Sequence, residues 1–366
     1  MADNSPAQVG DFISDNLTYM DALAAAQEQI FVAMDMATAG TAADLDLAQV
    51  VALFDASASL YDMQAEVERV LAACAGEDKP RDGEDKPCGG EDKPRLWQLA
   101  YPYLAVEVDR RYARRDLLEQ AWPQIQGIAG ELAQADAPTL AKMFAAGDGD
   151  FNALALAYAA LGTCDEAAQR LGRSTDEIDR AIEGLYKRIH ERCANDDGCL
   201  GEGTAASYAF ASALGLGDPR EMAARLSELV RSEGADADAM ATAYAFGVLN
   251  RYGHDDVAED WLRPRAQPRA IQWLVEGPGG LRLADDAGSA NHFVVRPYFS
   301  AQTDSVTRSY KTPRGQLFLT WERTERGIAL TMMVPAGTQV DLWLDGALQV
   351  IPADPDPITQ AFLVEA

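Results

Sequence analysis

The sequence predicts a mainly α-helical chain with an all-β region at its C-terminus, and three observations support this prediction. Apolar residues recur at three- and four-residue spacing from about residue 16 to 265, which is typical of amphipathic helices. From about residue 291 apolar and polar residues alternate instead, which is typical of strands. Hydrophobic residues make up 48 % of the 366, enough for a sizeable core. We therefore expect a helical domain over 1–287 and a β-domain over 288–366.

Capping residues at the expected starts of helices, and glycines at their expected ends, support the predicted helices. Asp218 is expected to cap a helix that begins at Pro219, because aspartate before proline is a common helix start. Ser174 opens a Ser-Thr-Asp-Glu capping box. The helices come in pairs joined by short turns, which favours stacked antiparallel hairpins. Glycines stand where helices should end, at Gly172, Gly215 and Gly253. The apolar spacing predicts helices over 23–36, 47–60, 96–108, 117–132, 154–161, 178–189, 208–214, 222–230 and 240–249.

The C-terminal region has the pattern of a small antiparallel β-sandwich. In the stretch 316–322, Leu317, Leu319 and Trp321 alternate with other residues. A turn ending at Gly327 leads into further strand-like segments at 328–334, 338–344 and 348–351. Short strands separated by Gly and Pro turns favour a sandwich. The boundary between the two regions is expected within 277–290.

One polar segment interrupts the helical pattern. Residues 75–94 contain the sequence Gly-Glu-Asp-Lys-Pro three times, at 76–80, 83–87 and 90–94. The repeat is too short and too polar to bury a core, so it is not a solenoid unit. We expect an exposed, irregular and dispensable surface loop. A calcium-binding acidic loop is the alternative, although a lysine follows each acidic pair and the spacing matches no EF-hand.

The net charge excludes several classes of partner. The chain has 31 Lys and Arg against 58 Asp and Glu, a formal charge of −27. Such a surface repels phosphate backbones and anionic lipids, so we expect no nucleic-acid or membrane partner. The longest uncharged stretch, 203–217, is shorter than the roughly 18 apolar residues that a membrane span needs. The N-terminus lacks the basic and apolar regions of a secretory signal, which leaves a cytoplasmic chain or a mature secreted form.

The cysteines and histidines leave two questions of chemistry open. Cys193 and Cys199 flank a tight loop and could form a disulfide, as could Cys74 and Cys88, which bracket the polar repeats. Unpaired thiols are the equally weighted alternative, because no secretory signal indicates an oxidising compartment. The chain has no Cys-x-x-Cys motif and only three histidines, so neither a metal site nor a cofactor is expected.

Helical hairpins followed by a β-sandwich resemble sugar-active toroids, in which paired carboxylates flank a glycosidic bond. One acid protonates the leaving oxygen, one base activates water, and aromatic rings stack on the sugar. Glu28 and Asp35 lie seven residues apart, on one face of an unbroken helix. Asp150 lies in a turn before an apolar helix, and Asp285 and Asp286 lie at the domain junction. A solvated Glu28 and a helix-capping Asp150 are the alternative interpretation.

Four C-terminal stretches have the sequence features of a known β-domain: 293–297, 309–315, 321–323 and 334–338. They resemble the C-terminal β-domain of the bacterial and fungal α-L-rhamnosidases. The helical part is similar to that family's six-hairpin (α/α) barrel, although it is short for six full hairpins, and Trp97 lies in a segment like the barrel's Trp-containing helix pair. The Gly-Asp-Gly-Asp150 segment and the Gly-Ser-Ala-Asn-His292 segment also have counterparts in the family.

The resemblance implies a site with an altered catalytic pair. Glu28 occupies the position of the family's catalytic acid, and Asp35 keeps its spacing of seven residues, but the flanking arginines and tryptophan are absent. The Trp-Glu motif that carries the base is missing, so Asp285, Asp286 or Glu276 would have to replace it. The implied substrate-binding residues are Asp35, Asp150, Trp97 and Tyr244.

Two functions follow from this resemblance. The first is a carbohydrate-active protein that hydrolyses terminal α-L-rhamnosides with impaired catalysis, because loss of a general base costs about 10²–10⁴-fold in rate. The second is a catalytically silent member of the fold that binds a glycan or serves in an assembly. Either function makes a carbohydrate, rhamnose-containing if family-like, the expected partner.

Overall fold

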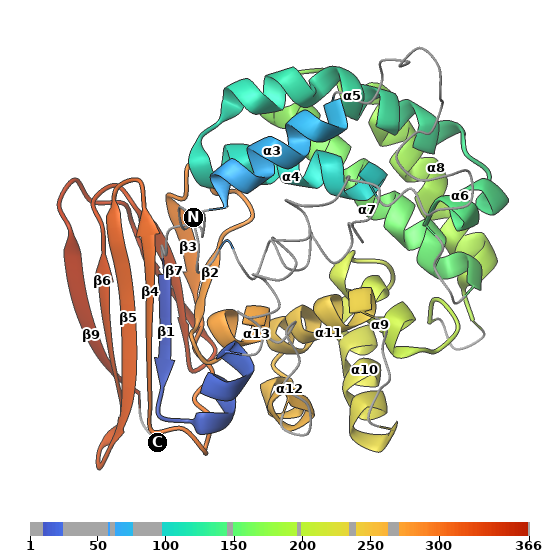
Figure 1. Cartoon of the computed structure of the whole chain (residues 1–366). Helices are drawn as coiled ribbons and strands as arrows, with labels where there is room; N and C mark the ends of the chain where they lie inside the picture. Colours follow the sequence, from blue (N-terminus) through green and yellow to red (C-terminus); the bar gives the residue numbers. More distant parts are fainter. Residues whose placement is uncertain are drawn as a thin grey trace, which may run out of the picture.

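The structure is a computed structural model of the chain, dominated by helices up to residue 276 and by strands after it (Figure 1). It describes residues 10–24, 58, 63–75, 97–144, 149–195, 199–233, 239–262 and 271–364. The labelled helices are α3 (Gln64–Ala75), α4 (Trp97–Tyr112), α5 (Arg115–Gln134), α6 (Ala137–Phe144), α7 (Gly149–Arg170), α8 (Asp176–Cys193), α9 (Ala205–Ala213), α10 (Pro219–Glu233), α11 (Ala239–Arg251), α12 (Asp255–Leu262) and α13 (Ile271–Glu276).

The helices are arranged in an inner and an outer layer. Within the inner layer α4 contacts α7, α7 contacts α9, α9 contacts α11, and α11 contacts α13. Four of these inner helices also pack against an outer helix that follows them in the chain: α5 on α4, α8 on α7, α10 on α9 and α12 on α11. In Figure 1 these hairpins follow one another around a curve that starts and finishes beside the strands. The predicted toroid of antiparallel hairpins is confirmed.

The composition of the helices explains which layer each one occupies. The inner helix α9 has the sequence AASYAFASA, and nearly all of its residues are buried. Small alanine and serine side chains allow neighbouring helices to pack on every side of it. The outer helix α8 instead buries one stripe of Ile178, Leu185 and Ile189 and carries charged residues elsewhere. A helix that is apolar all round belongs inside, whereas an amphipathic one covers it.

Most of the predicted helix ends are confirmed. The Asp218 carboxylate accepts hydrogen bonds from the backbone N–H groups of Arg220 and Glu221, at 2.9 and 3.3 Å, and thereby caps α10. Gly172, Gly215 and Gly253 have φ angles of 63°, 67° and 82° at helix ends, a conformation that favours glycine. The capping box at Ser174 is wrong: Thr175 is the N-cap of α8, without a side-chain cap, because its hydroxyl donates to the Asp179 carboxylate at 2.7 Å instead.

The strands form two sheets. The five-stranded sheet has the order β1-β4-β5-β6-β9 and is antiparallel throughout. The four-stranded sheet has the order β2-β3-β7-β8. The strands are β1 (Gly10–Ser14), β2 (Leu281–Leu283), β3 (His292–Val295), β4 (Ser305–Thr312), β5 (Gly315–Thr324), β6 (Gly327–Val334), β7 (Gln339–Leu344), β8 (Ala347–Ile351) and β9 (Ile358–Val364).

Three features of the sheets differ from the sequence prediction. The strand β1 pairs with β4 over Gly10–Ser14 and belongs to the β-region, although it begins the segment predicted as helical. The strand β2 also precedes the predicted boundary at residue 288. The four-stranded sheet is mixed rather than antiparallel, because β3 and β7 run parallel. The long connection between these two strands allows a parallel pairing that a tight turn could not make.

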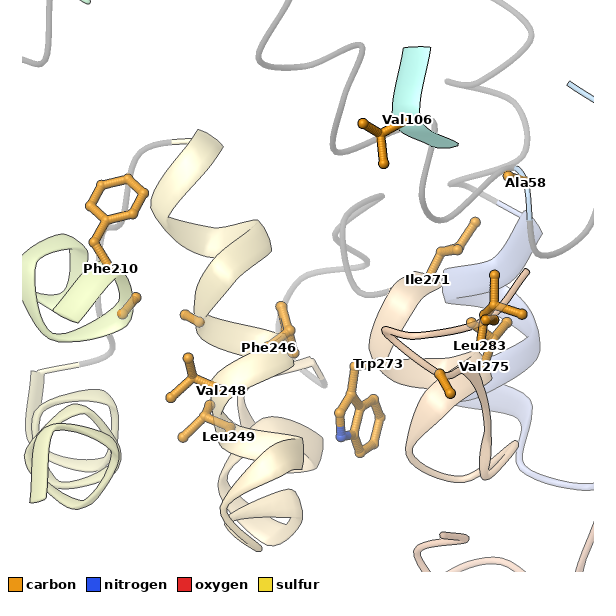
Figure 2. Close-up of a cluster of buried hydrophobic side chains, with 14 of the residues drawn as sticks. Ala58, Val106, Phe210, Phe246, Val248, Leu249, Ile271, Trp273, Val275 and Leu283 are labelled. Carbon is orange, nitrogen blue, oxygen red and sulfur yellow. The ribbon is translucent and has the colours of Figure 1, made fainter. Parts of the chain in front are cut away.

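The helical and the β-region share one continuous core. It includes Val106 of α4, Phe210 of α9, Phe246 of α11 and Trp273 of α13, which Figure 2 draws together with their neighbours. The ring of Trp273 lies 6.4 Å from that of Phe246. In the β-region Trp321 is fully buried, and its indole N–H donates to the Pro278 carbonyl at 2.9 Å. This bond ties β5 to the segment that leaves the last helix.

Two predictions concern residues that the structure describes only in part. The polar repeats at 76–94 lie outside the described residues, as does Cys88. Cys193 and Cys199 flank a short bridge between Ala194 and Leu200. The disulfides and the dispensable loop therefore stay predictions. Among the described residues, none of the helices has both the length and the apolar character that a membrane span requires.

Candidate functional site

The inner helices run parallel, so their first residues gather at one end of the toroid. The last turns of α4 and α7 meet where Arg170 Nη1 lies 3.4 Å from the Asp109 carboxylate. The first turns of α7 and α9 also lie close together. Gly201, in the loop before α9, is so near Phe151 of α7 that an added Cβ would lie 2.9 Å from the Phe151 ring. Phe210 and Tyr244 occupy equivalent positions in α9 and α11, and their ring centroids are 5.0 Å apart. We call the end formed by the first turns of α4, α7, α9 and α11 the helix-start end.

The helix-start end contains three of the predicted site residues. Trp97 is the first residue of α4, and Asp150 is the second residue of α7. Tyr244 is half-buried in the second turn of α11 and meets Phe210 in a T-shaped arrangement. Helix N-termini carry partial positive charge and unpaired N–H groups. This end therefore offers hydrogen-bond donors beside aromatic side chains.

Asn152 is a residue of this end that the site prediction missed. Its side chain is 2 % exposed, and its Oδ1 atom has no hydrogen-bond partner among the described residues. A buried carbonyl oxygen without a donor costs about 1–3 kcal/mol. The structure therefore places an acceptor here that a hydroxyl-bearing ligand would satisfy. The sequence shows Asn152 only as the second residue after Asp150, which gives no sign of its missing partner.

The loop opposite Asn152 is built closely against the helix start. Gly201 has a φ of 84°, and a Cβ there would lie 2.5 Å from the Ser207 side chain. Only glycine fits this position. Thr204 caps α9 by accepting from the Ser207 N–H at 3.2 Å, and the Ser207 hydroxyl accepts from the Thr204 N–H at 2.9 Å. This capping box fixes the start of α9 beside α7.

Asp285 and Asp286 lie at the other end of α7. The Arg170 guanidinium, in the last residue of α7, is 3.5 Å from the Ala287 carbonyl oxygen. Asp150 is near the first residue of the same helix, about 30 Å away at 1.5 Å per residue. The expectation that these carboxylates face one cavity with Asp150 is therefore wrong. The sequence could not show it, because chain order does not reveal which end of a helix a distant loop contacts.

The loop that carries Asp285 and Asp286 is held by α4 and by the turn between β4 and β5, in addition to its contact with Arg170 of α7. The Ala290 N–H donates to the Arg110 carbonyl of α4 at 3.1 Å, and Arg314 donates to the Ser289 carbonyl at 3.0 Å. Ser289 and Ala290 have φ angles of 56° and 47°, which side chains adopt only at a cost. The helical anchors of this loop belong to a buried charge cluster, in which Arg110 and Arg111 both pair with Glu107.

Both carboxylates of this loop are engaged in local pairs. The Asp285 carboxylate accepts from Arg282 at 2.9 Å, and the Asp286 carboxylate lies 2.7 Å from His292 Nδ1. Their side chains are 78 % and 76 % exposed. Glu28 and Asp35 lie outside the described residues. The structure therefore gives no distance between Glu28, the proposed acid, and a second carboxylate.

Two further carboxylates are buried where α12 meets the β-region. Glu259 accepts from the hydroxyl groups of Tyr19 and Ser300, both at 2.7 Å, and from Tyr298 at 3.2 Å. Burial, reinforced by the Glu259 carboxylate, raises the pKa of both tyrosines. These polar contacts join the N-terminal segment, α12 and the segment before β4. Their partners are all protein groups, so we assign them to the fold.

Burial also raises the pKa of Asp255, the second buried carboxyl group on α12. It accepts from Asn250 and from the Trp273 indole, both at 2.9 Å. In the part of the chain that the structure describes, His, Cys, Asp and Glu side chains form no cluster of three or more that could hold a metal ion.

A toroid of helical hairpins joined to a two-sheet β-region defines the class of fold. Comparison with known proteins shows which of them share it. Residues 280–351 match the family described as "Bacterial alpha-L-rhamnosidase C-terminal domain". The α-L-rhamnosidase of Streptomyces avermitilis, solved in complex with L-rhamnose, matches with a TM-score of 0.75 and 14 % identity over 98 % of this chain and 42 % of that one. No curated protein matches the chain in sequence.

Two other solved α-L-rhamnosidases give similar results. The enzyme from Aspergillus terreus has a TM-score of 0.75 at 14 % identity, covering 98 % of this chain and 50 % of that one. The enzyme from Dictyoglumus thermophilum has a TM-score of 0.73 at 14 % identity, covering 99 % and 50 %. The chain thus spans half or less of these solved chains. The resemblance stated from the sequence is confirmed for the fold, and for residues 280–351 also for the domain family.

Proposed function

We propose that the chain is a carbohydrate-binding protein of the rhamnosidase fold whose glycosidase activity is weak or lost, and that its sugar site is the helix-start end. The observation that carries the proposal is the buried, unpartnered Asn152 carbonyl oxygen at the start of an inner helix. Sugar hydroxyl groups are donors that such an acceptor would bind. Tyr244 supplies an aromatic ring at the same end, and sugars stack on aromatic faces.

The placement of the carboxylates supports weak catalysis. An inverting glycosidase needs its acid and base about 6.5–9.5 Å apart across the scissile bond. Asp285 and Asp286, two of the candidates to replace the missing base, lie at the opposite end of α7 from Asp150. A site with one carboxylate can hold a sugar and donate a proton but cannot activate water. The expected rate is then about 10²–10⁴-fold below that of a complete pair.

Binding and hydrolysis can be measured on the same preparations. We expect L-rhamnose or a rhamnose-terminated oligosaccharide to bind in calorimetry, and Tyr244→Ala to weaken binding by about 10-fold through lost stacking. Tyr244→Phe should bind within about 3-fold of the parent. Tyr186→Ala is the matched control, because Tyr186 is an exposed tyrosine on the outer helix α8.

Hydrolysis is followed by nitrophenol release from an aryl α-L-rhamnoside. Slow release, unchanged by Glu28→Gln, would agree with the proposal. Rapid release that Glu28→Gln abolishes would restore an active glycosidase with Glu28 as its acid. If neither the parent chain nor Tyr244→Ala binds sugar, the helix-start end is not a sugar site.

A further inference from the structure

The outward face of the four-stranded sheet carries an unusual set of side chains. Its inner face buries Phe293, Val295, Val340 and Leu342, and the Phe293 ring packs against Tyr310 of the other sheet at 5.5 Å. Because side chains alternate along a strand, the neighbouring residues of β3 and β7 share the opposite face. Trp343 is on that face and is 39 % exposed, although tryptophan gains much from burial.

The register of the strands shows which side chains surround this tryptophan. Trp343 of β7 is directly opposite Leu348 of β8, and Asp341 is opposite Val350. The next strand, β3, places His292 beside Gln339 and Val294 beside Asp341. Arg282 of β2 pairs with Val294 and completes the row. We call this set the outer sheet face: Arg282, His292, Val294, Gln339, Asp341, Trp343, Leu348 and Val350.

The polar half of the outer sheet face is a preformed hydrogen-bond network. The amide of Gln339 lies 3.2 Å from the Asp341 carboxylate and 3.1 Å from His292 Nε2. His292 Nε2 also lies 3.2 Å from Asp341, while its Nδ1 contacts Asp286. These contacts hold the side chains in place before any ligand arrives. Arg282 is similarly fixed by Asp285 at 2.9 Å.

We propose that the outer sheet face is a second carbohydrate-binding site, separate from the toroid, with Trp343 as the platform on which a sugar ring stacks. An indole ring beside fixed amide, carboxylate and imidazole groups matches a sugar, which has an apolar face and a rim of hydroxyl groups. The ligand class is a neutral glycan, because a chain of net charge −27 repels anionic polymers.

The same observations disfavour a protein partner on this face. The exposed apolar side chains are only Trp343, Leu348 and Val350 among the described residues of this sheet face. Stable interfaces bury about 1,200–2,000 Å² in total, and their centres are depleted of charged residues. Here Asp341 and His292 lie next to the apolar side chains. The experiment therefore also distinguishes glycan binding from pairing of two copies of the chain along the edge strand β8.

The test is affinity electrophoresis of the full chain in gels that contain a soluble neutral polysaccharide: galactomannan, arabinoxylan or mixed-linkage β-glucan. We expect retardation in at least one gel, and about a 10-fold weaker apparent affinity for Trp343→Ala. Trp343→Phe should stay within about 3-fold of the parent, since a smaller ring still stacks. Gln339→Ala should weaken binding without removing the platform. Met333→Ala is the matched control, because Met333 is an exposed apolar residue on the other sheet.

The outcomes separate this site from the toroid. Retardation that Trp343→Ala reduces and Tyr244→Ala leaves unchanged supports the outer sheet face by itself. The proposal is overturned if only Tyr244→Ala reduces the retardation, or if the parent chain is not retarded in any gel. A dimer in light scattering that Trp343→Ala dissociates, without glycan retardation, would make this face an interface between copies instead. Far-ultraviolet circular dichroism of each variant shows whether a loss of binding is a loss of fold.

Discussion

At the residue scale, a buried cluster of ion pairs holds the end of the inner helix α4. Glu107 is 1 % exposed and pairs with Arg110 and Arg111 one turn further along α4. Burial opposes the charged form of Glu107, but Arg110, Arg111 and the more distant Arg170 together outweigh it and lower the pKa from its ordinary value of 4.5. The carboxylate therefore stays charged and fixes the arginines beside the loop that precedes β3.

Replacing this carboxylate tests its contribution and its sign. A group whose pKa is lower in the folded state stabilises the fold above its unfolded pKa, and this stabilisation is lost as pH falls through the folded pKa. We expect Glu107→Gln to lower the free energy of unfolding by about 3 kcal/mol near pH 7, because it leaves buried arginines without their partner. The difference between variant and parent should shrink toward about pH 3. Urea unfolding at both pH values measures it.

The control for Glu107 is a surface pair of the same spacing. Glu191 pairs with Lys187 at 3.7 Å, and the two side chains are 62 % and 75 % exposed, so Glu191→Gln should cost less than about 0.5 kcal/mol. Equal effects of the two substitutions would show that burial of Glu107 adds nothing to its pairing.

The residue scale is also where sequence reasoning about the site was weakest. Asp150 and Tyr244 could be chosen from their residue type and neighbours, because carboxylates and aromatic rings are the usual parts of a sugar site. Asn152 could not, because what distinguishes it is a missing partner, and a partner is missing only in three dimensions. Trp343 could not be singled out for the same reason, since a strand tryptophan is normally buried.

At the element scale, the accuracy of prediction followed the length and regularity of each segment. The strands β5 to β8 were expected within a few residues of their bounds, because Leu317, Leu319 and Trp321 alternate clearly. The strand β1 was missed, because it has five residues and buries only Phe12 among those whose burial is described. Its partner strand β4 is nearly 300 residues away, and no local pattern reveals such a pairing.

The two faces of β1 give a prediction with its control in the same strand. Phe12 is 3 % exposed and packs against Tyr19 at 6.5 Å, whereas Ile13 is 58 % exposed. We expect Phe12→Ala to lower the free energy of unfolding by about 3 kcal/mol, as large-to-small core substitutions do. Ile13→Ala should change it by less than about 0.5 kcal/mol. Urea titrations followed by tryptophan fluorescence compare the two; similar losses would mean that β1 does not pack in this register.

At the scale of the whole molecule, the toroid and the sheets are joined by polar as well as apolar contacts. Glu259 of α12 receives hydrogen bonds from Tyr19, Tyr298 and Ser300, and Trp321 of β5 bonds to Pro278. The general architecture could be predicted from periodicity alone, but these contacts could not. The division into domains 1–287 and 288–366 stays a prediction, and the strand β1 already crosses it.

Removing the central carboxylate of this junction tests whether the two parts unfold together. We expect Glu259→Ala to lower the unfolding free energy by about 3 kcal/mol, because the buried Tyr19 and Ser300 hydroxyl groups and the half-buried Tyr298 hydroxyl group lose their acceptor. Thermal unfolding followed by helix circular dichroism and by tryptophan fluorescence should shift by the same amount and stay coincident. Two separated transitions in the parent chain would instead show domains that unfold independently.

The pairing of β1 with β4 also constrains when the protein can finish folding during synthesis. Gly10–Ser14 is translated before the helices of the toroid, yet its partner in the sheet, centred on Arg308, is translated after them. The buried Phe12 and its neighbours must therefore wait, unpaired, while every helix of the toroid is translated, at about 5–20 residues per second. A chain that stalls before residue 305 would hold a nearly complete set of helices and an open strand. Such a nascent chain would depend on chaperones to keep that strand from pairing elsewhere.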